Sequence, residues 1–104
     1  MAGRVSKEIS PQELSTRLKT GEDVKMLDVR EPEEWAAGHI RGAKHIPLGQ
    51  VLERLNELDA AGEELVVICR SGNRSGLACE LLEEKGFNVV NMTGGLLAWE
   101  DELV

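Results

Sequence analysis

The chain has 104 residues, with 12 basic and 19 acidic side chains, a net charge of −7 and only three aromatic residues. This length suits one domain, expected over residues 1–104, that buries a core without disulfides or metal, and the acidic balance disfavours nucleic acid and anionic membranes as partners. The first ten residues lack the apolar stretch of a signal peptide, and no apolar run reaches the length of a membrane span, so we expect a cytoplasmic protein.

The first third of the chain contains clear helix and strand signals. Ser10-Pro11-Gln12-Glu13 is a capping box with proline at the first helical position, and Gly21 can end the helix that it starts. Residues 24–29 are apolar and unbroken by glycine, which is typical of a buried strand. Acidic residues at positions 31, 33 and 34 then favour the start of a second helix.

This second helix is expected to carry Trp35 on its inner face and to end at Gly38. Residues 43–46 predict a brief strand, and the apolar spacing over residues 51–58 predicts an amphipathic helix. Residues 65–69 form the most hydrophobic strand signal of the chain. We therefore expect that strand at the centre of the sheet.

The last third of the chain repeats the alternation. A helical pattern runs from Leu77 to Gly86, residues 89–92 predict a final strand, and Gly94-Gly95 leads to a terminal helix that carries Trp99. Regular alternation of this kind predicts an α/β fold with a mostly parallel sheet and helices on both faces. In such sheets, ligands bind beyond the carboxyl ends of the strands.

Two of the predicted strands end in residues with chemical potential. One ends in Asp28-Val29-Arg30, and the other ends at Cys69, in the run LVVICRSGNRSG over residues 65–76. A strand that delivers a cysteine into a tight loop before a helix surrounds the sulfur with backbone N–H groups, and these favour the thiolate. Arg70 and Arg74 add positive charge at the same place. The pattern therefore predicts a reactive thiol at Cys69 rather than a buried structural cysteine.

The remaining cysteine and the histidines do not suggest a metal site. Cys69 and Cys79 are ten residues apart, which matches neither a redox CxxC pair nor a zinc knuckle, and His39 and His45 lie in another segment. We expect structural roles for both histidines and a small core side chain at Cys79. No metal and no cofactor are therefore expected.

Four blocks of the sequence resemble the rhodanese family. They appear in the family's order and span nearly the whole chain, which makes the resemblance specific. The blocks are Asp28-Val29-Arg30; Glu34-Trp35 with residues 38–43 and Ile46-Pro47; residues 69–75, CRSGNRS; and Gly94-Gly95 with Trp99.

The resemblance implies a rhodanese-like three-layer fold with a five-stranded sheet in the order 1-5-4-2-3. It also implies thiosulfate sulfurtransferase chemistry, with Cys69 carrying the transferred sulfur as a persulfide. A small anionic sulfur donor and a thiophilic acceptor such as cyanide or a thiol would be the partners. We further expect a monomer.

The loop residues have distinct expected roles in binding the donor. Backbone N–H groups of Arg70, Ser71, Gly72, Asn73, Arg74 and Ser75 would hold the persulfide sulfur, and the two guanidinium groups would steer the anionic donor. Gly72 and Asn73 would supply positive φ angles where the loop curls. Some family members carry a basic residue where this chain has Ser71, so Arg70 and Arg74 would take over that role.

The two other polar residues, Asp28 and Arg30, are interpreted as a buried pair that supports the site rather than as direct catalysts. Trp35 and Trp99 are assigned to the core. The acidic patches, including residues 31–34, are assigned to solvated faces.

Two other functions compete with catalysis of sulfur transfer. Cysteine-dependent phosphatases and arsenate reductases use a wider loop, with five residues between cysteine and arginine, whereas only residues 70–73 intervene here. The tighter ring favours a single sulfur over a tetrahedral oxyanion. The second alternative is a persulfide carrier or regulatory module in a sulfur relay with a protein partner.

Overall fold

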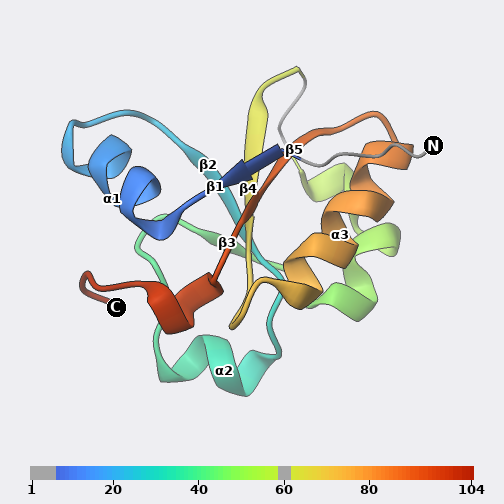
Figure 1. Ribbon diagram of the computed structural model, residues 1–104. Coiled ribbons are helices and arrows are strands. Elements are labelled where there is room, and N and C mark those ends of the chain that lie inside the picture. The colour runs from blue at the N-terminus through green and yellow to red at the C-terminus, as the bar shows by residue number, and fades with distance from the viewer. Residues whose placement is uncertain (1–6, 59–61) are drawn as a thin grey trace.

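The computed structural model describes residues 7–58 and 62–104 and places five strands in one sheet. Their order is β1-β5-β4-β2-β3, and every neighbouring pair is parallel (Figure 1). The α/β fold and the expected strand order are thus confirmed. Residues 1–6 and 59–61, which belong to the expected single domain, lie outside the described residues.

The element bounds define the frame of the site. The strands are β1 (Lys7–Ile9), β2 (Lys25–Asp28), β3 (Lys44–His45), β4 (Glu64–Ile68) and β5 (Asn88–Met92). The α-helices are α1 (Pro11–Lys19), α2 (Pro32–Ala37) and α3 (Asn73–Glu84). Three 3-10 helices complete the list: η1 (Leu48–Glu53), η2 (Leu55–Glu57) and η3 (Gly95–Ala98).

Each face of the sheet buries its own apolar core. Strand β4 shows the division: Leu65 and Val67 belong to the core beneath α3, η1 and η2, whereas Val66 and Ile68 belong to the core beneath α1 and η3 (Figure 1). Side chains alternate between the two faces of a strand, so a strand covered on both sides must be apolar throughout. The central position expected for this strand is confirmed.

The first helix begins as its sequence predicts. The Ser10 hydroxyl oxygen accepts a hydrogen bond from the Glu13 backbone N–H at 3.0 Å, and Pro11 occupies the first helical turn. The helix ends at Lys19, and Gly21 follows with a φ of 86°. This stop returns the chain toward β2.

Two of the expected helices are shorter than predicted. The amphipathic helix expected over residues 51–58 is replaced by the 3-10 helices η1 and η2, which are separated at Arg54, where φ is −123°. The terminal helix is only η3, and Trp99 stands directly after it. In both segments, short 3-10 turns are enough to bury the apolar side chains against the sheet, so a regular α-helix is not required.

The assignment of Trp35 to the core is wrong. Its half-buried ring stacks on the His39 ring with centroids 3.5 Å apart, and on the His45 ring with centroids 4.8 Å apart. The histidines thus have the structural role expected of them, and aromatic stacking replaces core packing at Trp35. Among the described residues, no helix combines the length and the apolar character needed to cross a bilayer.

Candidate active site

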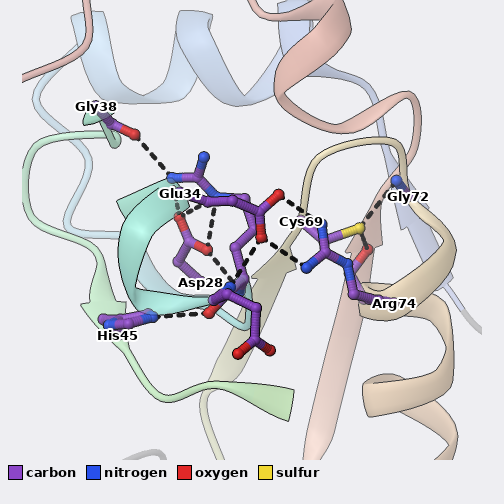
Figure 2. Close-up of polar contacts among 10 residues, drawn as sticks. Asp28, Glu34, Gly38, His45, Cys69, Gly72 and Arg74 are labelled. Carbon is purple, nitrogen blue, oxygen red and sulfur yellow. Dashed lines mark hydrogen bonds and ion pairs between the residues drawn. The ribbon is translucent and has the colours of Figure 1, made fainter. Parts of the chain in front are cut away.

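The two polar strand ends lie side by side, as the strand order requires. Asp28 pairs in register with Ile68, and the Val29 backbone N–H donates to the Ile68 carbonyl at 2.9 Å. Cys69 therefore follows the end of β4 directly beside the end of β2, where Figure 2 shows its sulfur facing Gly72. The candidate site occupies the carboxyl edge of the sheet, as expected for a parallel α/β fold.

The Cys69 sulfur lies inside a ring of hydrogen-bond donors. The Gly72 backbone N–H donates to Sγ at 3.0 Å (Figure 2). The Ser75 hydroxyl oxygen lies 3.3 Å from Sγ. Burial raises the pKa of the Cys69 thiol, but the Ser75 hydroxyl and the backbone N–H groups of Ser75, Gly72 and Ser71 outweigh it. The pKa therefore falls below its ordinary value, and the site favours the thiolate.

The N–H groups of the loop can point toward the sulfur because the carbonyl groups of Cys69 and Arg70 point away from it, toward hydrogen-bond donors in η3. The Cys69 carbonyl accepts from the Leu96 N–H at 3.0 Å, and the Arg70 carbonyl accepts from the Leu97 N–H at 2.9 Å. Both donors belong to η3, which therefore holds the outer side of the loop. A Cβ atom at Gly95 would lie 2.4 Å from the Arg70 carbonyl, so only glycine allows this close approach.

Of the two residues expected to have positive φ in the loop, only Gly72 does. Gly72 has a φ of 103°, in the region that favours glycine, which confirms its expected backbone angle. The same expectation for Asn73 is wrong, because Asn73 is the first residue of α3 and no non-glycine residue among those described has a positive φ. Helix α3 begins at Asn73, four residues before the start expected at Leu77, so the second half of the predicted loop is helical.

The two arginines of the loop have different surroundings. Arg74 is half-buried and makes two hydrogen bonds to the Glu34 carboxylate, at 2.7 and 2.9 Å (Figure 2). Arg70 is exposed, as are Ser71 and Asn73. The positive charge of Arg74 is therefore largely compensated, whereas that of Arg70 faces solvent.

Comparison with known proteins identifies this arrangement. The family model for the rhodanese-like domain matches residues 10–102. The chain belongs to the rhodanese-like family. Bacillus subtilis YtwF, which carries a provisional sulfurtransferase name, is 46% identical over 96 residues, 92% of each chain. A protein of Allochromatium vinosum named sulfurtransferase is 40% identical over 88% of this chain and 86% of its own.

A solved structure shows the same fold. The rhodanese-like domain protein from Staphylococcus aureus superimposes with a TM-score of 0.88 at 38% identity, covering 94% of this chain and 96% of that one. Together, the family and the relatives support sulfur transfer in general for this rhodanese-like domain.

Glu34 is a site residue that sequence reasoning assigned to a solvated face. The carboxylate accepts from the Arg74 guanidinium and from the Glu31 backbone N–H at 2.9 Å. The Arg74 hydrogen bonds chiefly lower its pKa from 4.5 to about 2, against the opposing effect of burial. Glu34 belongs to the second block of the family resemblance, but nothing near it in the sequence indicates the ion pair, because its partner Arg74 lies forty residues away.

Asp28 and Arg30 form a buried pair, as expected. Their side chains are 1% and 7% exposed, and Arg30 donates through Nε and a terminal nitrogen to the Asp28 carboxylate at 2.9 to 3.1 Å. Arg30 also donates to the Gly38 carbonyl at 2.8 Å, and the His45 ring nitrogen lies 2.8 Å from the Arg30 carbonyl (Figure 2). This network links the end of β2 to the end of α2 and to β3.

Two further polar residues complete the surroundings of the sulfur. Cys79 is fully buried in the core beneath α3, where burial raises its pKa to about 12. That thiol is a core side chain, as expected.

Asn91 of β5 is a residue near the sulfur that the sequence analysis does not identify. Its side chain contacts both Ser75 and Gly72. The signal available in the sequence was a lone polar residue within the apolar strand pattern of residues 89–92.

Proposed function

We propose that this rhodanese-like domain is a sulfurtransferase that moves a sulfane sulfur from thiosulfate, or a related anionic donor, to a thiophilic acceptor through a persulfide at Cys69. The observation that carries the proposal is the hydrogen bonding of the Cys69 sulfur, which lowers the pKa of a buried thiol against the effect of burial. A buried thiol without such donors would be inert.

The reaction is a double displacement. The Cys69 thiolate attacks the outer sulfur of thiosulfate; a new S–S bond forms, the S–S bond of the donor breaks with its electron pair, and sulfite leaves. The acceptor, written as cyanide, then attacks the outer sulfur of the persulfide, thiocyanate forms and the thiolate returns. No general base is needed because the nucleophile is already ionised and the leaving group is a stable anion.

The loop supports each stage with fixed donors. The backbone N–H groups of Ser71, Gly72 and Ser75, which favour negative charge at the inner sulfur, would extend to the outer sulfur of the persulfide. The exposed Arg70 would attract the dianionic donor, while Arg74, held by Glu34, would contribute less charge. Cys69 is fully buried in this state, so donor access requires movement of the exposed loop residues.

The same geometry disfavours phosphoryl transfer. Residues 70–73 are the only ones between Cys69 and Arg74, and the Arg74 guanidinium is engaged by a carboxylate rather than free to bind oxyanion atoms. A ring of this size accommodates one sulfur atom better than a tetrahedral group with three bound oxygens.

Intact mass of the reduced protein after incubation with thiosulfate tests the proposal. We expect a gain of about 32 Da, one sulfur atom, that is absent in Cys69→Ser and is lost on addition of cyanide with release of thiocyanate. The variant should stay folded, because a hydroxyl is nearly isosteric with a thiol but cannot form a persulfide.

Three outcomes separate the alternatives. A sulfur adduct retained by Cys69→Ser would overturn the assignment of the carrier residue. Loading by a persulfide-bearing protein but not by thiosulfate would replace the small donor with a protein partner and favour a sulfur relay. Release of phosphate from phosphoesters, without sulfur loading from either donor, would contradict the sulfurtransferase proposal.

A further inference from the structure

The Ser75 hydroxyl lies between two hydrogen-bond acceptors, the Cys69 sulfur and the Asn91 amide oxygen, and it has only one hydrogen to donate. Its oxygen is 3.3 Å from Cys69 Sγ and 2.5 Å from Asn91 Oδ1. A serine hydroxyl donates one hydrogen bond and accepts up to two, so it cannot donate to the sulfur and to the amide oxygen at once. At any moment, one of the two contacts must be satisfied in another way.

The orientation of the Asn91 amide is set by the loop. Its Nδ2 atom donates to the Gly72 carbonyl at 3.3 Å, and a carbonyl can only accept. The amide oxygen must therefore face Ser75, where it also can only accept. At 2.5 Å, this oxygen requires the Ser75 hydrogen between the two atoms, because otherwise lone pairs would face each other at a short distance.

These contacts close a ring of hydrogen bonds around the nucleophile. When Cys69 is a thiol, its S–H donates to Ser75, Ser75 donates to Asn91, and Asn91 donates to the Gly72 carbonyl, while the N–H of the same glycine donates to Sγ. Every donor in this ring has an acceptor. When Cys69 is a thiolate, Sγ has no hydrogen to give and becomes a strong acceptor, so the ring loses this match.

We propose that Asn91 is a positioning residue that controls the Ser75 hydroxyl, taking its hydrogen while the Cys69 sulfur is uncharged and yielding it when that sulfur is a thiolate. This inference deepens the proposed function. Only its consequence for the persulfide rests on that function. In the persulfide, the negative charge moves to the outer sulfur and the inner sulfur becomes a weak acceptor. The Ser75 hydrogen then returns to Asn91, and the ring favours the loaded state over the free thiolate.

The charged and titratable groups around the ring are few. Arg74 and its partner Glu34 lie on one side, and the Cys79 thiol lies one helical turn beyond Ser75 within α3. Arg70 adds an exposed charge from the loop, and the buried Asp28–Arg30 pair lies at the neighbouring strand end. Strand β5 contributes Asn91 but no charged residue. All the charged and titratable groups named here stay unchanged in the Asn91, Ser75 and Asn88 variants below.

A double-mutant cycle tests the control of the hydroxyl. The pKa of the Cys69 thiol is measured from thiolate ultraviolet absorbance against pH in the wild type, Asn91→Ala, Ser75→Ala and the double variant, with Cys69→Ser as the blank. Because Asn91 competes for the hydrogen, we expect Asn91→Ala to lower the pKa by about 0.5 to 1 in the wild type. The same substitution should lack this lowering in Ser75→Ala, where no hydroxyl remains to be controlled.

The cycle separates control of the hydroxyl from support of the loop. Loss of the hydrogen bond to the Gly72 carbonyl acts in both backgrounds and cancels in the difference between them. Equal effects of Asn91→Ala in the two backgrounds, or a higher pKa confined to the wild type, would overturn the proposal. Asn91→Leu, which keeps the side-chain volume without the oxygen, repeats the cycle if the alanine variant does not fold.

A control on the same strand checks the integrity of β5. Asn88 pairs with Glu64 at the opposite end of the strand pair, so Asn88→Ala should leave the pKa of the Cys69 thiol unchanged. The titration requires no sulfur donor, so its result is independent of sulfur transfer. If Asn91→Ala lowers the pKa only when Ser75 is present, but Cys69 takes up no sulfur, the ring is supported and the proposed function is contradicted. If Cys69 takes up sulfur but the two substitutions act independently on the pKa, the proposed function is supported and the role of Asn91 is contradicted.

Discussion

Arg70 and Arg74 have the same charge and follow Cys69 closely in the chain, yet they differ in the partners that the fold provides. Arg74 makes a bidentate ion pair with Glu34, whereas Arg70 is exposed. A planar guanidinium held by a carboxylate contributes geometry more than net field. Steering of an anionic donor should therefore depend chiefly on Arg70.

Arg70→Ala should raise the KM for thiosulfate by roughly threefold to tenfold at low salt, because it removes an exposed charge of the loop that has no ion-pair partner among the described residues. The effect should shrink at high salt, where screening weakens steering. Steady-state kinetics at two ionic strengths check this, with Lys85→Ala as the control for charge, since Lys85 lies at the opposite end of α3. An equal loss in both variants would assign the effect to net charge alone.

Asp28→Asn should lower the free energy of unfolding by about 3 kcal/mol, because it leaves a buried guanidinium without its counter-charge. Arg30 is only 7% exposed on its side chain and has no carboxylate partner other than Asp28 among the described ion pairs. Urea unfolding checks the loss against Glu13→Gln, which removes one side of the surface pair with Arg17. That control should cost less than about 1 kcal/mol, and similar costs in the two variants would contradict a supporting role for the buried pair.

Between elements, the Glu34–Arg74 pair joins the first turns of α2 and α3 across the carboxyl edge of the sheet (Figure 2). Glu34 also accepts from the Glu31 N–H, so one carboxylate both caps α2 and anchors the start of α3. The start of α3 carries Ser75, one of the donors to the sulfur. Through Arg74, the short helix α2 therefore helps to position Ser75 next to the Cys69 sulfur.

Glu34→Gln should lower the free energy of unfolding at neutral pH by about 1 kcal/mol, after allowance for solvent screening of this partly exposed pair. Because folding lowers the pKa of Glu34, its carboxylate stabilises the fold above pH 4.5, and this contribution is lost as pH falls toward about 2. The difference between wild type and variant should shrink across that window. Glu33→Gln, at an exposed neighbour, should show no such dependence in urea unfolding, and a pH-independent difference for Glu34→Gln would contradict the ion-pair account.

Over the whole molecule, the segment after β5 closes on the loop after β4. Gly95 of η3 packs against the backbone of Cys69 and Arg70, and the following two N–H groups bond to the carbonyls of those residues. In addition, Asn91 of β5 donates a hydrogen bond to the Gly72 carbonyl of this loop. The loop after β4 is thus held by parts of the chain that come nineteen or more residues later.

Gly95→Ala should lower the free energy of unfolding by more than about 3 kcal/mol and reduce sulfur loading of Cys69, because strain at positive φ is joined by a clash with backbone. The new Cβ would lie 2.4 Å from the Arg70 carbonyl at a φ of 59°. Gly21→Ala is the matched control: φ is 86°, but nothing lies within 4 Å of its Cβ. It should cost about 1 to 2 kcal/mol and leave loading unchanged. Equal costs would mean that strain alone matters at Gly95.

Local pattern in the sequence determined the elements that depend on neighbours along the chain. The capping box starts α1, the uniformly apolar run places β4 in the centre of the sheet, and Gly72 supplies the positive φ of the loop after β4. Each of these can be read from a few consecutive residues of the sequence. Strand β1 has only three residues and gave no alternation to recognise, so the resemblance alone supplied the fifth strand.

Tertiary structure decided whatever depends on a distant partner. Packing on the sheet broke the expected helix over residues 51–58 into 3-10 turns, and stacking on two histidines drew Trp35 out of the expected core. Glu34 and Asn91 gained their roles from Arg74 and Ser75, which lie forty and sixteen residues away. Hydrogen bonds and ion pairs require distances near 3 Å, and only the folded chain sets such distances between remote residues.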